Sequence, residues 1–564
     1  MKTSRGVSQV VFNFLPQQTF DHADRVWKVD RWSEPRILHI DIDVVREALR
    51  RVAYPWTTNG LDGGFAERLS DEELRVVSPS EDGGVRAVPF PELWYCRKCR
   101  RLAKSQDNPC VCGNSRWGQL AFVAFHDCGR LETPWVPSCP QHGQRRVNLP
   151  KSASISEMVF DCPLCQKVIA RGFPFVKCPC GKGTYQHQPP RAAVVYTPRS
   201  TVIVNPPSAS EAAQLKTESG REQVLEWVLR GLRERKPLEG AKTVDSIVAS
   251  MVASGVEEKV AKVAAAAAAA EDATIQQAPA PQASLSGESL ELASEAALLV
   301  AYATASGRTL VSDLAAHAPP ALQPRYAVKY PKAIRESGLE AVELLDEFPV
   351  MNASFGFTRG GHPAGQSNLQ WFKTANGAPR VHGQLSKTEA LLFRLDPAKV
   401  LEWLVANGHG LQSKTDPRDA RVEILRHARI PAAGDDPSVE TVGANVLRLL
   451  HSYSHRVMRR ISKFAGIDRD SLSEYLIPEH LTFAIYAAAR GDFVLGGLQA
   501  LFEHDLAEAI EEIVRGEHRC ALDPGCTTHG GACVACLHVG EPSCRLFNQF
   551  LDRRTLFGAR SFLT

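Results

Sequence analysis

Residues 96–113 read CRKCRRLAKSQDNPCVCG, and residues 162–181 read CPLCQKVIARGFPFVKCPCG. Each stretch holds two close pairs of cysteines, namely Cys96 and Cys99 with Cys110 and Cys112, and Cys162 and Cys165 with Cys178 and Cys180. Four thiolates in two pairs suit a tetrahedral Zn²⁺ ion. A glycine follows each second pair, where the lack of a side chain lets backbone N–H groups approach the sulfurs. The spacing predicts two zinc ribbons, each with a closed, structural site of four cysteines.

The composition agrees with metal rather than disulfide chemistry. The chain has 564 residues, a net charge of +3 and 44% apolar residues, which excludes a heavily basic protein and predicts a globular one of several domains. No apolar run reaches the length of about 18 residues that a membrane span needs. The N-terminus lacks the pattern of a secretory signal, so we expect a cytoplasmic protein without membrane association. Thiols stay reduced there, and clustered cysteines then indicate metal sites.

Two further groups of cysteines extend this prediction. His126, Cys128, Cys139 and His142 lie between the two ribbons and form a possible third N-terminal site; the alternative is that they are loop residues. Five more cysteines lie near the C-terminus, of which four suffice for one zinc ion: Cys520, Cys526, Cys533, Cys536 and Cys544. A redox role for the Cys533-x2-Cys536 pair is disfavoured by the three extra cysteines. We therefore expect three zinc ions, or four if the third N-terminal site binds metal.

The fold class predicted is mixed α/β (α+β), multidomain, with inserted zinc ribbons and a C-terminal zinc-binding domain of helices and strands. Five segments are expected: an α/β segment at 1–90, the ribbons at 91–190, a helical segment at 191–325, an α/β segment at 326–435 and the zinc-binding domain at 436–564. The third segment contains seven alanines, Ala264 to Ala270, followed by a Pro- and Ser-rich stretch, which predicts a helix and then a flexible linker around 264–290.

Three elements of the second half have clear patterns. Residues 391–395 predict a strand, followed by a helix that starts at Asp396-Pro397. Residues 440–464 predict an amphipathic helix, and residues 481–488 predict a buried strand. Gly496-Gly497 is expected to open a further helix that extends from Leu498 to about Val514.

The predicted helix at 440–464 also carries candidate metal ligands and candidate phosphate-binding residues. His451 and His455 are one turn apart, so both can face one metal ion, and Glu474 could complete a nuclease-like site; the alternative is packing between helices. Ser452 stands where a zinc peptidase needs its glutamate, which excludes that mechanism. The same helix carries a basic stripe that could contact phosphates without reading sequence: Arg456, Arg459, Arg460 and Lys463. No phosphate-binding loop is present, because Gly181-Lys182-Gly183-Thr184 lacks the upstream glycine, so no ATP hydrolysis is expected.

Several motifs together resemble a known family. LLHSYSH (449–455), Gly496-Gly497-Leu498, Asp523-Pro524-Gly525-Cys526, GGACVACL (530–537) and CRLFNQFLDR from Cys544 are similar to a C-terminal zinc-binding domain of unknown function. That domain accompanies superfamily 2 helicases and resembles the zinc-binding module of MrfA-type DNA repair helicases. EFPVMNASFGFTR (347–359) and TEALLFRLDPAKVLEWL (388–404) extend the resemblance to the DrmB family, core subunits of the bacterial DISARM anti-phage systems.

The resemblance implies a function that the residues alone do not. It implies a non-catalytic, DNA-binding subunit that pairs with a DrmA-type superfamily 2 helicase, which supplies the ATPase, and that helps to restrict phage DNA. It also implies zinc-ligand roles for Cys526, Cys533, Cys536 and Cys544, with Cys520 as the alternative fourth ligand. A metal-dependent nuclease and a scaffold without DNA contact are the alternatives.

Overall fold

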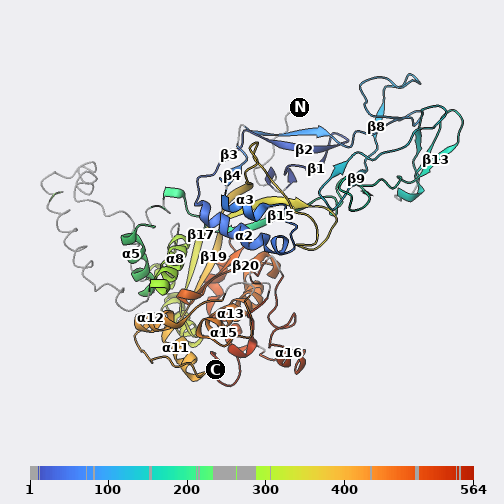
Figure 1. Ribbon diagram of the computed structural model, residues 1–564. Coiled ribbons are helices and arrows are strands. Elements are labelled where there is room, and N and C mark those ends of the chain that lie inside the picture. Colours follow the sequence, from blue (N-terminus) through green and yellow to red (C-terminus); the bar gives the residue numbers. More distant parts are fainter. Residues whose placement is uncertain are drawn as a thin grey trace. The chain divides into compact units, whose positions relative to one another are not determined.

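The computed structural model describes residues 10–11, 13–71, 73–80, 83–150, 155–210, 213, 216–232, 262, 287–304, 307–431, 435–488, 495–516, 518–540, 543–544, 546 and 548–563. These residues form a mixed α+β, multidomain protein (Figure 1). The chain divides into two compact units, one made of 1–206 and 351–386 and the other of 207–350 and 387–564. The alanine run and the predicted linker up to residue 286 lie outside the described residues.

The first unit combines helices with small sheets and with strands of a nine-stranded sheet. One three-stranded antiparallel sheet has the order β1-β2-β5. Strand β4 pairs with β3 and, in parallel, with β19 near Val381, whereas β15 and β18 each pair with β17. The bounds are β1 (Thr19–His22), β2 (Arg25–Ser33), β3 (Arg36–Ile37), α2 (Ile42–Thr58), α3 (Phe65–Asp71), β4 (Arg75–Ser78), β5 (Gly84–Pro89), β15 (Thr197–Val204), β17 (Leu339–Thr358), β18 (Gln370–Trp371) and β19 (Arg380–Leu395).

The cysteine-rich segment of the first unit forms three further three-stranded sheets, with the orders β7-β6-β8, β10-β9-β14 and β11-β12-β13. Figure 1 draws these strands in blue to teal, joined by irregular loops. Their cores are small; one consists of Leu93, Leu120, Val136, Val147, Met158, Phe160 and Phe173. The bounds are β6 (Trp94–Cys96), β7 (Leu102–Ala103), β8 (Trp117–Gln119), β9 (Val123–Phe125), β10 (Leu131–Glu132), β11 (Arg146–Asn148), β12 (Val159–Asp161), β13 (Val168–Arg171) and β14 (Gln186–Gln188).

The second unit packs helices around antiparallel strands. Strand β21 pairs with β20 and with the second half of β19, and β16 pairs with the first half of β17. The bounds are α5 (Glu218–Leu229), α8 (Gly287–Ala303), β16 (Thr309–Leu310), α9 (Val311–His317), α10 (Tyr330–Glu336), α11 (Pro397–Ala406), α12 (Pro417–His427), α13 (Val442–Ala465), β20 (Leu472–Ile477), β21 (Thr482–Ala487), α14 (Gly497–Ala500), α15 (Leu506–Arg515) and α16 (Gly525–Thr528).

Helix α13 is central to this unit. The side chain of Thr441 caps its first turn by accepting a hydrogen bond from the Ala444 N–H group, and Gly466 ends it in the left-handed conformation. Its apolar face, including Leu450 and Val457, lies in the largest apolar core of the described residues. The prediction of an amphipathic helix at 440–464 is therefore confirmed.

The other predicted elements also form. Strand β19 ends at Leu395, and α11 follows with Asp396 as its cap, because the carboxylate accepts from the N–H groups of Ala398 and Lys399. Strand β21 matches the predicted buried strand. The helix expected after Gly496-Gly497 forms as α14 and α15, with a π-helical segment, Leu501–Asp505, between them.

Candidate metal centres

The first predicted ribbon brings its four cysteines together. The sulfur atoms of Cys96, Cys99, Cys110 and Cys112 all lie within 4.8 Å of one another. Strand β6 ends at Cys96, which pairs with Trp117 of β8. This pairing holds together the two ends of the loop between the strands, and the loop carries the other three cysteines. The Gly113 N–H group bonds to the Cys110 carbonyl oxygen with φ at 79°, a conformation that favours glycine. This group is a closed four-cysteine site that could hold a metal ion.

The second predicted ribbon is divided between two groups. Cys162 and Cys165 lie with Cys139 and His142, whose Nδ1 atom is 3.6 Å from the sulfurs of both Cys139 and Cys162. The cause is the pairing of β11 with β12. Residues 139–142 precede β11 and residues 162–165 follow β12, so the antiparallel register Arg146↔Asp161 sets the two pairs side by side.

The remaining pair of the second ribbon completes a third group. Cys178 and Cys180 lie with His126 and Cys128. The Cys128 and Cys178 sulfurs are 3.6 Å apart, and His126 Nδ1 is 3.5 Å from the Cys180 sulfur. Here β14 pairs with β9, with His187 opposite Ala124. This pairing brings the segment after β9, which contains His126 and Cys128, close to the segment before β14, which contains Cys178 and Cys180.

These positions correct two sequence-based predictions. The four cysteines of the second ribbon do not form one site together: Cys162, Cys165, Cys178 and Cys180. The two cysteines and two histidines between the ribbons do not form one site either: His126, Cys128, Cys139 and His142. Instead, each histidine joins three cysteines. The local pairs were recognisable from their spacing, but strand pairing over tens of residues decides which pairs meet.

The C-terminal group consists of Cys520, Cys526, Cys533 and Cys536. The sulfurs of Cys520 and Cys533 are 3.4 Å apart, and those of Cys526 and Cys536 are 3.7 Å apart. Cys520 is thus the fourth member, and Cys544 is not, although the resemblance implies the reverse order of preference. Cys544 lies instead beside His451 of α13, 3.2 Å from its Nε2 atom.

Hydrogen bonds favour the thiolate at one cysteine of the first group and at one cysteine of the C-terminal group. Burial opposes ionisation of Cys96, but the N–H groups of Cys99 and Lys98 and the Asn114 amide outweigh it and lower the pKa of this thiol to about 6. Burial likewise opposes ionisation of Cys533, and hydrogen bonds from Cys520 and from the N–H groups of Ala535 and Cys536 lower its pKa to about 7. The thiolate is the metal-binding form, so Cys96 and Cys533 are the thiols of their groups most ready to bind a cation. Burial instead raises the pKa of Cys99 to about 12 and also raises the pKa of Cys526.

Neighbouring residues hold the metal-binding loops in place. Asp127, between His126 and Cys128, has its carboxylate 3.1 Å from His362 Nε2. The buried Arg359 donates through Nε to the Gly129 carbonyl oxygen at 2.9 Å. In the second unit, Arg459 donates to the carbonyl oxygens of Val534, Ala535 and His538, which surround Cys536. Such outer contacts orient ligands and are a regular part of metal sites.

The predicted basic stripe on α13 therefore needs correction. Arg456 is buried and donates to the Ile513 carbonyl oxygen, Arg459 binds the loop described above, and Arg460 forms an ion pair with Glu512 at 2.8 Å. Of the four residues, Lys463 alone is exposed. The physical reason is that α13 lies inside the unit, so its guanidinium groups bind carbonyl and carboxylate oxygens of the protein.

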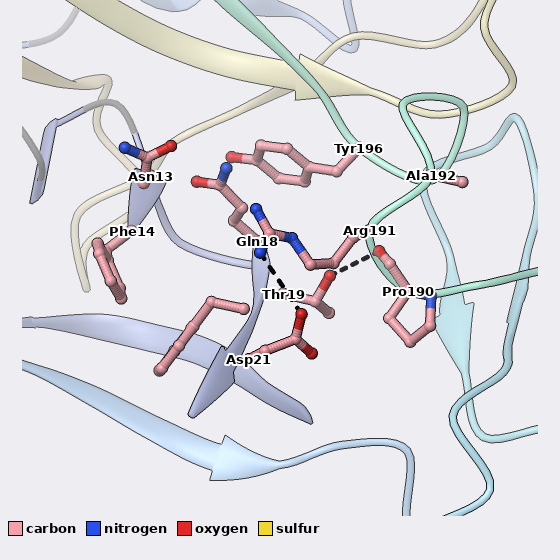
Figure 2. A pocket seen from close by; sticks show the side chains of 10 residues that line it. Asn13, Phe14, Gln18, Thr19, Asp21, Pro190, Arg191, Ala192 and Tyr196 are labelled. Atoms are coloured by element: carbon pink, nitrogen blue, oxygen red, sulfur yellow. Dashed lines mark hydrogen bonds and ion pairs between the residues drawn. The ribbon is translucent and has the colours of Figure 1, made fainter. Parts of the chain in front are cut away.

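A pocket of about 370 Å³ lies between β1 and the segment 190–196 in the first unit (Figure 2). The Thr19 hydroxyl donates to the Pro190 carbonyl oxygen at 2.6 Å, and Arg191 forms an ion pair with Asp21 at 3.4 Å. Figure 2 shows Gln18, Arg191 and Tyr196 around it. None of the metal-binding groups of the described residues lines this pocket.

Comparison with known protein families gives a match to the first part of the chain. Residues 6–194, which include the three N-terminal metal-binding groups, match a family described as a domain of unknown function, DUF8724. Among curated proteins, none matches the chain. Within the described residues, no helix is long and apolar enough to cross a membrane.

Proposed function

We propose that this chain is a non-catalytic, zinc-stabilised DNA-binding subunit that acts with a DrmA-type superfamily 2 helicase in an anti-phage restriction system. The proposal of DNA binding rests on one observation: the three ribbons with candidate metal sites have exposed cations and exposed aromatic rings. The partner and the biological role rest on the resemblance of the C-terminal motifs to the DrmB family. Cytoplasmic localisation belongs to the same proposal.

Zinc is the metal that these ligands suit best. Two groups offer four cysteines and two offer three cysteines with one histidine. Thiolate and imidazole ligands at tetrahedral sites select zinc, and four protein ligands leave no position for a substrate. We therefore assign these four sites a structural role.

The ribbon segment carries a net positive charge because it contains few acidic residues. Residues 91–190 contain 14 of the 66 lysines and arginines but only 6 of the 63 aspartates and glutamates. The excess of positive charge is therefore eight. Ten thiolates with three bound divalent cations contribute four negative charges, so the segment with metal bound still has a net charge of about +4. The rest of the chain is net acidic, because the whole carries only +3. A local positive surface of this kind attracts the phosphate backbone.

Exposed side chains on the ribbons supply both kinds of nucleic-acid contact. Arg97, Lys98 and Lys104 are exposed around the first site, and such cations neutralise phosphates. Phe175 is 91% exposed and Trp135 is 57% exposed. Surfaces on which single-stranded bases stack combine exposed rings with cations. This combination favours DNA over a purely structural role for the ribbons.

The nuclease alternative is not part of the proposal. His451, His455 and Glu474 are completely buried. A phosphodiester must reach its catalytic groups, and the described structure gives it no access to these three.

The DNA-binding proposal is tested by fluorescence anisotropy of the purified full chain with labelled single- and double-stranded DNA over a series of salt concentrations. We expect binding that weakens with salt. The Arg97→Gln/Lys98→Gln/Lys104→Gln variant should bind more weakly, and each lost phosphate contact should reduce the slope of log K against log salt by about 0.7 to 0.9. The matched control is Lys332→Gln, at an exposed lysine of the second unit.

Two outcomes would contradict the proposal. Absence of DNA binding at low salt, with retention of the helicase on co-purification, favours a scaffold without DNA contact. ATP hydrolysis by the isolated chain contradicts the assignment of the motor to another polypeptide. Co-expression with a DrmA-type helicase tests the partner directly, and we expect the two chains to co-purify.

A further inference from the structure

The fifteenth cysteine lies in a fully buried group of four side chains. His451 and His455 of α13, Glu474 of β20 and Cys544 place one ligand atom each within 4.8 Å of one another. The two histidines and the glutamate are 0% exposed, and Cys544 is 3% exposed. The four cysteine-rich groups described above contain the other 14 cysteines, so this group accounts for the last one.

The hydrogen bonds of His455 define which nitrogen faces the group. Its Nδ1 atom is 2.9 Å from the Leu537 carbonyl oxygen, which can only accept, so Nδ1 carries the proton. In the neutral ring, Nε2 then presents a lone pair, and it faces the Glu474 Oε1 atom at 3.4 Å. Two acceptors in a dry interior repel each other unless a proton or a metal cation lies between them.

His451 faces the same oxygen. Its Nε2 atom is 3.1 Å from Glu474 Oε1 and 3.2 Å from the Cys544 sulfur. Protonating both rings would place two imidazolium groups in contact, since the ring centroids are 4.4 Å apart. A divalent cation instead satisfies two imidazoles, one carboxylate and one thiolate together. The resulting site is neutral, as a buried site must be.

Hydrogen bonds with the surroundings orient three of these four side chains, namely Glu474, Cys544 and His455. The Ser454 hydroxyl donates to Glu474 Oε2, which leaves Oε1 for the cation. The Asn548 N–H group donates to the Cys544 sulfur at 3.2 Å, an interaction that favours the thiolate. The Leu537 carbonyl oxygen fixes the His455 tautomer. Metal ligands are regularly oriented by outer hydrogen bonds of this kind.

We propose that His451 Nε2, His455 Nε2, Glu474 Oε1 and Cys544 Sγ bind a further zinc ion in a closed, structural site. The ion joins α13 and β20 to the segment around Cys544. Four protein ligands and complete burial exclude a catalytic role. The site does not depend on the proposed DNA binding, because it concerns the interior of the second unit.

The test is metal counting by native mass spectrometry and elemental analysis of the purified full chain. We expect five zinc ions in the wild type and four in both Cys544→Ser and His455→Gln. The matched control is Tyr453→Phe, a buried neighbour on α13 whose hydroxyl donates to the Ser337 carbonyl oxygen, and it should retain five. A wild-type count of four with all four cysteine-rich sites filled would show a metal-free ion pair and overturn the proposal.

A second measurement covers the case in which the variants do not fold. Crystals of the wild-type chain, measured on both sides of the zinc absorption edge, should show an anomalous peak surrounded by the four named atoms. Peaks at the cysteine-rich groups without one here would contradict the proposal. A peak that belongs to another element, such as iron or manganese, would contradict the assignment of zinc.

Discussion

Arg459 shows how one side chain on α13 supports the candidate metal site near the C-terminus. Its guanidinium group donates to three carbonyl oxygens in the loop that contains Cys533 and Cys536. The sequence predicts a basic stripe at this position, but it does not tell whether a guanidinium faces phosphate or protein. That depends on the loop at 534–538, which is distant in the sequence.

We expect Arg459→Met to weaken zinc binding at the C-terminal site by about 10- to 100-fold, because the loop loses its outer hydrogen bonds. The measurement is the loss of zinc to a competing chelator, followed by native mass spectrometry. Lys463→Met, one turn further along the same helix and exposed, is the control and should leave zinc binding unchanged. Equal zinc loss from both variants would contradict this role.

The regrouping of the cysteine pairs makes a second prediction at the residue scale. Cys162 and Cys165 share a group with His142, whereas Cys178 and Cys180 share one with His126. The variant Cys162→Ser/Cys165→Ser/Cys178→Ser/Cys180→Ser should therefore lose two metal ions. Replacement of either pair alone should cost one ion. Loss of a single ion from the fourfold variant would instead support the grouping expected from the sequence.

Among the elements, α13 has an apolar pattern that predicts a helix clearly, but it also has a glycine in its first turn, which helix propensity disfavours. Its apolar spacing predicts the helix, and the structure confirms it from Val442 to Ala465. The glycine at position 443, in the first turn, is explained by a tertiary contact and not by helix propensity. A Cβ atom at this position would overlap the Arg429 carbonyl oxygen.

This contact reverses the effect expected from helix propensity. Alanine is preferred over glycine within helices by about 1 kcal/mol. We expect Gly443→Ala to lower the free energy of unfolding nevertheless, because the backbone at Arg429 must move. Urea denaturation measures the change, with Lys463→Ala as an exposed control expected to stay within about 0.5 kcal/mol. A stabilised Gly443→Ala protein would contradict the close contact.

In the ribbons, the sequence predicts the cysteine pairs but not the strand pairing that brings them together. Cysteine pairs such as Cys96 and Cys99 are local, so their spacing identifies them. The two-to-four-residue strands that align the pairs have little sequence signal of their own, as in β9 and β14. Their pairing depends on contacts such as His187 opposite Ala124. The kind of site and the members of the first group were therefore predictable, but the members of the second and third groups were not.

We expect the ribbons, whose cores are small, to depend on the proposed metal ions for their stability. A structural zinc ion supplies on the order of 10 kcal/mol towards folding such a module. We expect removal of metal by a strong chelator to accelerate tryptic cleavage more than about tenfold within 97–182, where exposed sites include Lys98 and Lys167. Cleavage within α2, which packs in an apolar core that contains none of the candidate metal ligands, should change little. Equal acceleration in both regions would contradict a ribbon-specific dependence on metal.

For the whole molecule, different parts of the chain have different tasks. We propose that the positively charged, metal-binding ribbons face DNA, and that the second unit supports a C-terminal metal site whose motifs resemble those of helicase-associated proteins. The mixed α+β fold class was predictable because α13, β19 and β21 have clear patterns. The role of Cys544 was not predictable, because its partners are 70 to 93 residues away.

The central claim is that the cysteines of this chain are metal ligands, and the number of ions bound by the intact wild-type protein tests it most directly. Native mass spectrometry of protein purified without added metal or chelator gives that number. We predict five zinc ions, four in the cysteine-rich groups and one in the buried group at His451. A protein that folds with fewer than four bound ions would contradict this claim.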